Sequence, residues 1–106
     1  MPRRKVPDPF AEKVGARVRA LRKERGMSIT KFAEASGVSK GQISTIERGL
    51  VVIKIQTVVA LARGLDVAPG QLVTFPEDSA LDAAIELLYR LPEEERRAVV
   101  AKIRRG

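Results

Sequence analysis

The stretch Ser28-Ile-Thr-Lys-Phe-Ala-Glu-Ala-Ser-Gly-Val-Ser-Lys-Gly-Gln-Ile-Ser-Thr-Ile-Glu-Arg-Gly49 decides the fold. It holds two segments that each open on a serine, which caps helix N-termini well, and close on a glycine, which favours helix ends. The first segment predicts a helix from Ser28 to about residue 35, and the second a helix from Ser39 to about residue 48. Since only a tight link separates them, the pair forms a helix-turn-helix pattern.

Helical spacing continues on both sides of this pair. Apolar residues from Phe10 to Leu21 recur at three- and four-residue steps, which predicts a helix that ends at Gly26. Downstream we expect an exposed loop at 50–53, then a helix at about 54–64 with Ile55 on its apolar stripe. A short fifth helix is expected at 68–73, with a proline in its first turn.

The last part of the chain predicts two more helices. After a linker at 75–78, Ser79 and Asp82 resemble a capping box that opens an amphipathic helix. A second amphipathic helix follows Leu91-Pro92. Two helices of this size cannot bury their apolar faces alone, so they fold back on the domain or pair with a second copy.

These patterns together predict an all-α protein. We expect a flexible basic arm at 1–9, because its prolines disfavour regular structure, then a five-helix domain at 10–75. A C-terminal two-helix hairpin is expected at 79–106.

Composition narrows the function. The chain of 106 residues holds no cysteine and no histidine, which excludes thiolate metal sites, zinc chemistry and His-based catalysis. It also lacks a glycine-rich phosphate loop, so we expect no enzymatic activity, no cofactor and no metal. No apolar run approaches the ~20 residues that cross a membrane, and a chain without cysteine suits the reducing cytoplasm.

The charge indicates an anionic partner. The net charge is +7, and most of the excess lies in residues 1–25, which hold nine basic and three acidic residues. A localised positive charge favours nucleic acid as the binding partner, and an anionic membrane surface is the second choice. Because no basic helix with an apolar face adjoins the arm, we do not expect membrane binding.

Residues 14–73 resemble the Cro/repressor type of helix-turn-helix domain, the XRE family. The segments that carry the resemblance are Val18–Ser28, Phe32-Ala33, Gly37–Ser39, Ile43–Gly49, Thr57–Ala62 and Leu65–Val67. The resemblance implies a five-helix, lambda-repressor-like fold and an operator-binding role. This chain departs from the family at Ile29, where glutamine is usual, and in the apolar loop after Gly49.

The helix at 39–48 is the expected recognition helix, which must offer polar side chains to base edges in the major groove. Since Ile43 and Ile46 face the core, the other side of the helix faces outward. Gln42 can pair with adenine, Lys40 can reach guanine or a phosphate, and Gly41 allows close approach. The predicted DNA-binding residues are Ser39, Lys40, Gly41, Gln42, Ser44, Thr45 and Arg48, together with Thr30 and Lys31, and Arg3, Arg4 and Lys5 of the arm. The alternative for the helix at 39–48 is that its outward side is an ordinary polar helix face. The alternative for the arm is that it is an unstructured tail with incidental charge.

Two further sets of residues receive structural roles. The resemblance implies that Arg22 and Glu47 form a buried ion pair between the first and third helices. The apolar run Leu50-Val51-Val52-Ile53 needs cover, either from the core, for at least Ile53, or from another protein. We favour an interface, and the predicted interface residues are Leu50, Val51, Val52, Leu88, Val99 and Ile103.

The sequence therefore predicts a sequence-specific DNA-binding transcription regulator. We expect a cytoplasmic repressor that binds a palindromic operator as a homodimer, because a two-fold protein matches two half-sites about one helical turn, ~34 Å, apart. The alternative is a protein-interaction module, antitoxin-like or an adaptor, that uses the loop at 50–53 and the C-terminal helices to bind a protein partner.

Overall fold

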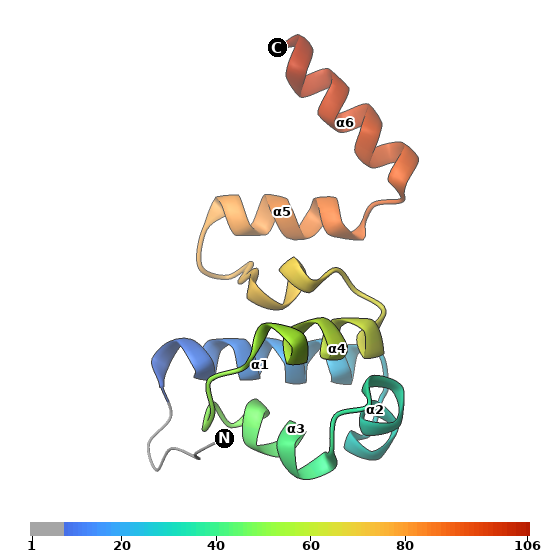
Figure 1. The fold of residues 1–106 in the computed structure, drawn as a ribbon. Coiled ribbons are helices and arrows are strands. Elements are labelled where there is room, and N and C mark those ends of the chain that lie inside the picture. The colour runs from blue at the N-terminus through green and yellow to red at the C-terminus, as the bar shows by residue number, and fades with distance from the viewer. Residues whose placement is uncertain (1–7) are drawn as a thin grey trace. The chain divides into compact units, whose positions relative to one another are not determined.

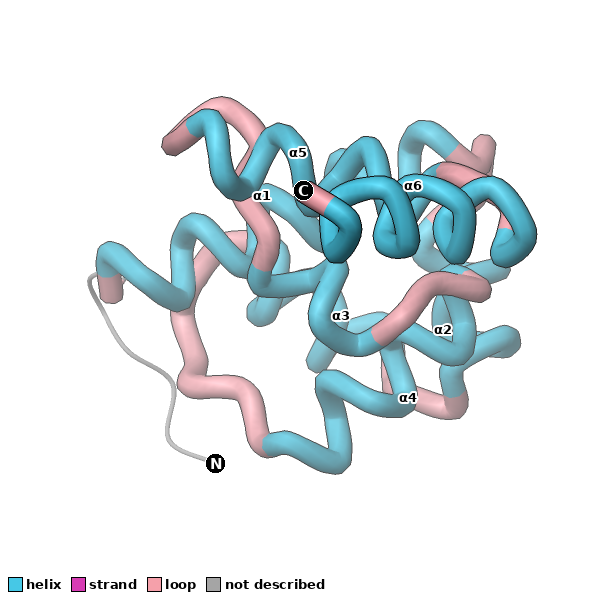
Figure 2. The backbone as a smooth tube through the Cα atoms, turned by 90° about the horizontal axis from the view of Figure 1, so that it is seen from above, coloured by secondary structure: helices cyan, strands magenta, loops and turns pink. Residues whose placement is uncertain are grey.

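The computed structural model describes residues 8–106, and all regular structure in that range is helical (Figures 1 and 2). The elements are α1 (Pro9–Glu24), α2 (Ile29–Ser36), α3 (Lys40–Glu47), α4 (Ile55–Leu65), the 3-10 helix η1 (Pro69–Val73), α5 (Ala80–Arg90) and α6 (Glu93–Arg105). The predicted all-α fold is confirmed. The chain divides into two compact units, and the boundary falls between Val73 and Thr74.

The core of the first unit lies where its five helical elements meet. Helix α2 packs against α3 and α4, and α1 packs against α3 and η1. The largest fully buried side chains come from all five elements and are Val18, Leu21, Phe32, Ile43, Ile46, Leu61, Leu65 and Leu72. Burial of these apolar groups is the main force that holds α2 and α3 in place.

Helix α1 begins earlier than the sequence pattern suggested. Asp8 caps it, because its carboxylate accepts a hydrogen bond of 3.0 Å from the Ala11 N–H. Pro9 occupies the first helical position, where its missing N–H costs nothing. The predicted arm at 1–9 therefore loses Pro9 to the helix, and the arm residues Arg3, Arg4 and Lys5 lie outside the described residues. Phe10 is 57% exposed, so the buried stripe of α1 starts after it.

The connection from α3 to α4 differs from the exposed loop expected at 50–53. Leu50 and Val51 are buried in the first unit, which contradicts their predicted exposure as interface residues. Val52 is exposed and Ile53 is half-buried. Ile55 is 80% exposed, so its predicted place on the buried stripe of α4 is wrong. As the first residue of α4, it precedes the turns that pack on α2.

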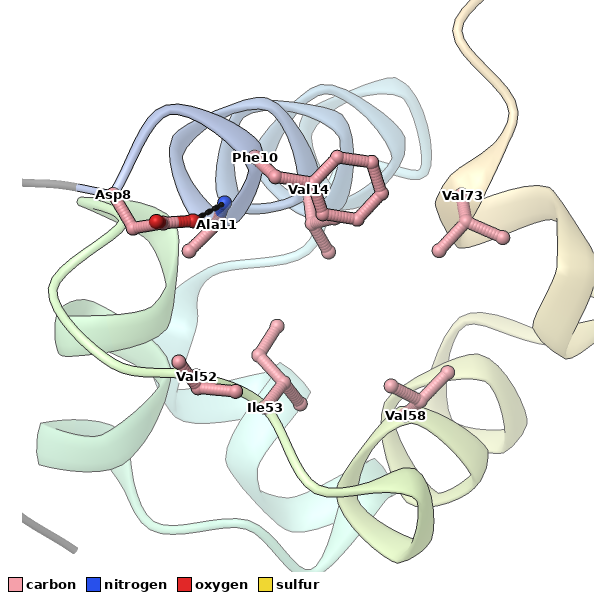
Figure 3. A pocket seen from close by; sticks show the side chains of 8 residues that line it. All are labelled: Asp8, Phe10, Ala11, Val14, Val52, Ile53, Val58 and Val73. Carbon is pink, nitrogen blue, oxygen red and sulfur yellow. Dashed lines mark hydrogen bonds between the residues drawn. The ribbon is translucent and has the colours of Figure 1, made fainter.

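An open apolar pocket lies beside this connection (Figure 3). Its volume is about 180 Å³, and its wall is formed by the start of α1, the connection before α4, α4 itself and the end of η1. The pocket is lined by Asp8, Phe10, Ala11, Val14, Val52, Ile53, Val58 and Val73. Ile53 therefore points toward the body of the domain.

Two helices approach their neighbours through glycines. At Gly64 in α4, an added Cβ would lie 2.8 Å from the Ser36 Cβ of α2. Gly64 therefore lies inside the helix and lets α4 approach α2 closely. The helix ends at Leu65, and the next residue, Asp66, forms the cap with a left-handed backbone (φ 57°). At Gly15 in α1, an added Cβ would lie 2.9 Å from the Glu47 carbonyl oxygen and closer still to that of Ile46.

We expect Gly15→Ala to destabilise the protein by about 1–3 kcal/mol, because overpacking against backbone atoms forces α1 away from α3. Chemical denaturation followed by circular dichroism measures the loss. Gly41→Ala is the matched control, since Gly41 is also helical but has nothing within 4 Å of an added Cβ. Equal stability changes in the two variants would contradict the close packing of α1 on α3.

The second unit contains α5 and α6. Ser79 caps α5 by accepting a hydrogen bond of 3.0 Å from the Asp82 N–H. The Asp82 carboxylate accepts from the Phe75 N–H at 2.8 Å, so it does not complete the capping box that the sequence suggested. Helix α6 diverges from α5 at Leu91-Pro92 (Figure 1) and has no buried residue, so the two helices form an open pair.

Candidate nucleic-acid interface

The turn between α2 and α3 is built by local hydrogen bonds. Gly37 ends α2 in a left-handed conformation (φ 78°), and its N–H donates to the Ala33 carbonyl at 2.9 Å. The buried Ser36 hydroxyl donates to the Phe32 carbonyl at 2.7 Å and accepts from the Val38 N–H at 3.2 Å. This serine joins the last turn of α2 to the link that leads into α3. Sequence reasoning gave it no role, although a serine at a helix end often bonds to nearby backbone.

Helix α3 has one buried face and one exposed face. Ile43 and Ile46 are buried in the core. Lys40, Gly41 and Gln42, at the start of the helix, are exposed. The structure therefore brings the predicted base-reading residues together on the first exposed turn of α3. This arrangement suits a helix that inserts its N-terminal end into a major groove.

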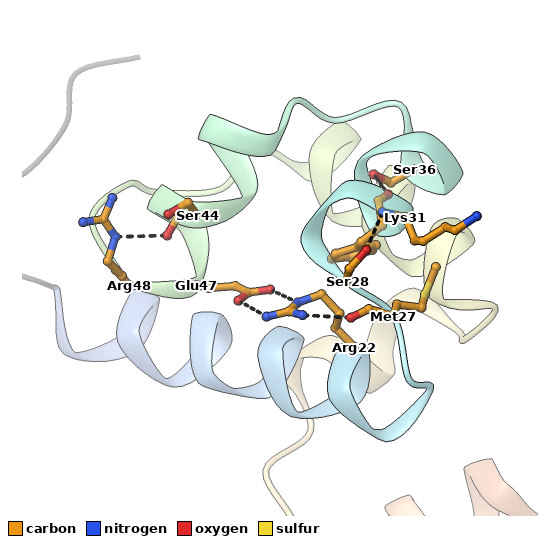
Figure 4. Close-up of polar contacts among 9 residues, drawn as sticks. Arg22, Met27, Ser28, Lys31, Ser36, Ser44, Glu47 and Arg48 are labelled. Atoms are coloured by element: carbon orange, nitrogen blue, oxygen red, sulfur yellow. Dashed lines mark hydrogen bonds and ion pairs between the residues drawn. The ribbon is translucent and has the colours of Figure 1, made fainter.

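The other predicted residues of α3 have local partners. The Ser39 hydroxyl accepts a hydrogen bond of 3.2 Å from the Gln42 N–H, so it caps the helix. Thr45 is half-buried, and its hydroxyl donates to the Gly41 carbonyl at 2.9 Å. Ser44 is also half-buried, and its carbonyl accepts from the exposed Arg48 at 3.3 Å (Figure 4). The hydroxyl groups of Ser39 and Thr45 are therefore engaged with the helix backbone, whereas Lys40 and Gln42 are exposed.

The start of α2 carries two further predicted DNA-binding residues, Thr30 and Lys31. The Ser28 hydroxyl accepts a hydrogen bond of 3.0 Å from the Lys31 N–H (Figure 4). Thr30 and Lys31 are both exposed. A capped helix start with an exposed lysine attracts anions, because backbone N–H groups and the helix dipole add to the positive charge.

Arg22 connects three segments of the first unit (Figure 4). Its Nε donates to Glu47 at 2.7 Å, and its Nη2 donates to the second oxygen of the same carboxylate at 2.9 Å. Its Nη1 donates to the Met27 carbonyl at 2.8 Å. The structure thus brings together the two residues that the sequence paired, and both side chains are buried, at 9% and 6% exposure.

The ion pair also raises the affinity of the Arg22 guanidinium for its proton. Hydrogen bonds from Arg22 to Glu47, and the negative charge of that carboxylate, raise the pKa of the guanidinium above its ordinary value, although burial acts in the opposite direction. Arg22 therefore stays charged, and the charge is balanced inside the domain. The pair fixes α3 to α1.

The described residues also bear on two other kinds of site, a metal centre and a membrane-spanning segment. Across residues 8–106, no three aspartate or glutamate side chains gather where they could hold a metal ion. In the same range, none of the helices combines the length and the apolar character that a bilayer-crossing segment needs.

Known proteins share this sequence pattern. A family model described as a helix-turn-helix domain matches residues 13–75. The HTH-type transcriptional regulator SinR of Bacillus subtilis is 32% identical over 74 residues, which cover 69% of this chain and 67% of SinR. The HTH-type transcriptional regulator SutR of Escherichia coli is 34% identical over 62 residues, which cover 58% of this chain and 35% of SutR.

Solved structures share the fold. The restriction-modification controller protein C.AhdI from Aeromonas hydrophila has a TM-score of 0.60 and 31% identity, over 61% of this chain and 98% of its own. The SinR/SinI protein complex has a TM-score of 0.63 and 27% identity, over 86% of this chain and 94% of the matched chain.

The fold and the exposed face of α3 define a helix-turn-helix DNA-binding protein. The chain belongs to the Cro/repressor-type (XRE) family of helix-turn-helix proteins. It is a DNA-binding transcription regulator and not an enzyme.

Proposed function

We propose that this protein is a repressor that binds a palindromic operator as a homodimer, with α3 of each subunit in a major groove. The observation that carries the proposal is the division of α3 into a buried apolar face and an exposed turn with Lys40, Gly41 and Gln42. Lys40 and Gln42 are the side chains that pair with base edges. Lys31 and Thr30 at the start of α2 bind the phosphates that set the register of the complex.

Exposed apolar side chains support dimerisation. On the C-terminal helices, Leu81, Leu87 and Ile103 are each more than two-thirds exposed. Of the predicted interface residues, Ile103 and Val52 are exposed, whereas Leu88 and Val99 are half-buried. Exposed leucines and isoleucines on amphipathic helices favour contact with another protein surface, and a second copy is the partner that a two-fold operator needs.

A second candidate role is the binding of a different protein through the C-terminal helices. The observation that favours it is the match to the SinR/SinI complex. That match spans 86% of this chain, which is more than the first unit alone can supply, so it extends into the second unit. The two roles are compatible, since α3 and the C-terminal helices are separate parts of the chain.

Footprinting and light scattering test the proposal together. On DNA upstream of the protein's own gene, we expect protection of two half-sites about one helical turn, ~34 Å, apart. Light scattering is expected to give a mass twice that of the 11.6 kDa chain. Binding that is blind to sequence and strongly weakened by salt would contradict the proposal, as would a monomer both alone and on DNA.

A further inference from the structure

Gly41 lies at the centre of the exposed face of α3. Successive residues of an α-helix turn by about 100°, so position 41 points almost directly away from the side occupied by Ile43 and Ile46. Those two isoleucines are buried in the core. Lys40 and Gln42 lie on either side of Gly41, and all three residues are exposed.

The fold does not require a glycine at this position. Gly41 has a helical backbone and is not among the described residues with positive φ. An added Cβ would meet nothing within 4 Å. The other glycines inside α-helices, Gly15 and Gly64, differ because each contacts the backbone of a neighbouring helix. Since glycine is among the least favourable helix residues, Gly41 lowers the stability of α3 without any packing benefit in the described structure.

Gly41 is exposed, and an added Cβ there would meet nothing within 4 Å, so the helix surface at this position is bare. The Thr45 hydroxyl donates to the Gly41 carbonyl at 2.9 Å, so the proton of that hydroxyl is already used. Without a side chain, Gly41 presents only its Cα, and the one group of the Thr45 side chain that is not engaged in the hydrogen bond is its methyl group. The group in the major groove that makes apolar contacts of this kind is the C5-methyl of thymine.

We infer that Gly41 is a specificity-determining residue, which lets the backbone of α3 approach the groove floor and accommodates a thymine methyl group between Gly41 and Thr45. The inference rests on the proposed function, because it requires α3 to lie in a major groove. Lys40 and Gln42 then reach the base pairs on either side of that thymine. A side chain at position 41 would hold the helix away from the bases and weaken all three contacts.

The test uses the full chain and a duplex selected from a random library by the wild-type protein. We expect Gly41→Ala to bind this duplex about 10-fold more weakly, since a methyl group at the contact displaces the helix. Its binding to an unrelated duplex is expected to stay unchanged, because phosphate contacts dominate there. Replacing the thymine that faces α3 with uracil should weaken wild-type binding about three- to fivefold, the effect of losing one methyl contact.

A compensated variant separates this effect from helix stability. Gly41→Ala should raise the unfolding midpoint by a few degrees. Ala20 is exposed in the middle of α1, so Ala20→Gly should lower the midpoint by a similar amount. We expect the double variant Ala20→Gly/Gly41→Ala to unfold like the wild type and still bind the selected duplex about 10-fold more weakly.

The outcomes distinguish the inference from the proposed function. If the wild type enriches no sequence, the proposed function and the inference both fail. If it enriches a duplex that Gly41→Ala binds equally well, only the inference about Gly41 fails. Equal affinity for the thymine and uracil duplexes would overturn the methyl contact.

Discussion

Replacing Arg22 with alanine is expected to destabilise the protein by about 3–5 kcal/mol, because the carboxylate of Glu47 would stay buried without a partner. That loss is a large part of the stability of a small domain, which is about 5–15 kcal/mol in total. The variant also loses the bond from Arg22 to the Met27 carbonyl, which has a length of 2.8 Å. Urea denaturation followed by circular dichroism measures the change.

A paired substitution serves as the control. Arg22→Met combined with Glu47→Leu removes both charges and fills the same space, so it should recover most of the stability lost in Arg22→Ala. A loss below about 1 kcal/mol in Arg22→Ala would place the pair among exposed ion pairs, whose contribution is small. That result would contradict the buried geometry described here.

The second large effect concerns target discrimination. We expect Lys40→Ala combined with Gln42→Ala to weaken binding to the selected duplex roughly 100-fold or more, because each good base contact contributes about 1–3 kcal/mol. Fluorescence anisotropy with the selected duplex and with an unrelated duplex measures the ratio of affinities. We expect this ratio to approach one in the double variant.

Lys102→Ala is the matched control for charge. Lys102 is an exposed lysine of α6, so its removal lowers the net charge without changing α3. We expect it to leave the ratio of affinities unchanged. If the α3 double variant kept the wild-type preference for the selected duplex, the assignment of α3 as the reading helix would be wrong.

The helices could be predicted from the sequence because their limits depend on local chemistry. Ser28, Ser39 and Ser79 each cap the helix that the pattern assigned to them. Gly37 ends α2 in the left-handed conformation. Each of these interactions joins residues within four positions of one another, so a short stretch of sequence contains all of the information.

Close packing between helices could not be predicted in the same way. Gly15 and Gly64 contact Ile46, Glu47 and Ser36, which are distant in sequence, so nothing near either glycine marks the contact. Ile55 fits the spacing of a buried stripe but lies 80% exposed, because periodicity does not show where a helix first meets its neighbour.

The candidate site was predictable in outline only. The spacing of Ile43 and Ile46 is enough to place the outward face of α3. The hydrogen bond from the Thr45 hydroxyl to the Gly41 carbonyl depends on the side-chain conformation of Thr45, and the sequence pattern does not show that conformation. Burial of Leu50 and Val51 also required the structure, since four apolar residues in a row fit a core segment as well as the interface that the sequence analysis favoured.

The three-way contact of Arg22 has a thermodynamic consequence for the proposed binding of α3 to DNA. Since α1, α3 and the segment around Met27 share one guanidinium, α3 cannot loosen without breaking a buried charge pair. The backbone of α3 is therefore already ordered before DNA arrives, and binding pays no ordering entropy for it. In the proposed complex, the groups that lose conformational freedom are long surface side chains such as Lys40 and Gln42, and each costs about 0.5–1.5 kcal/mol to immobilise.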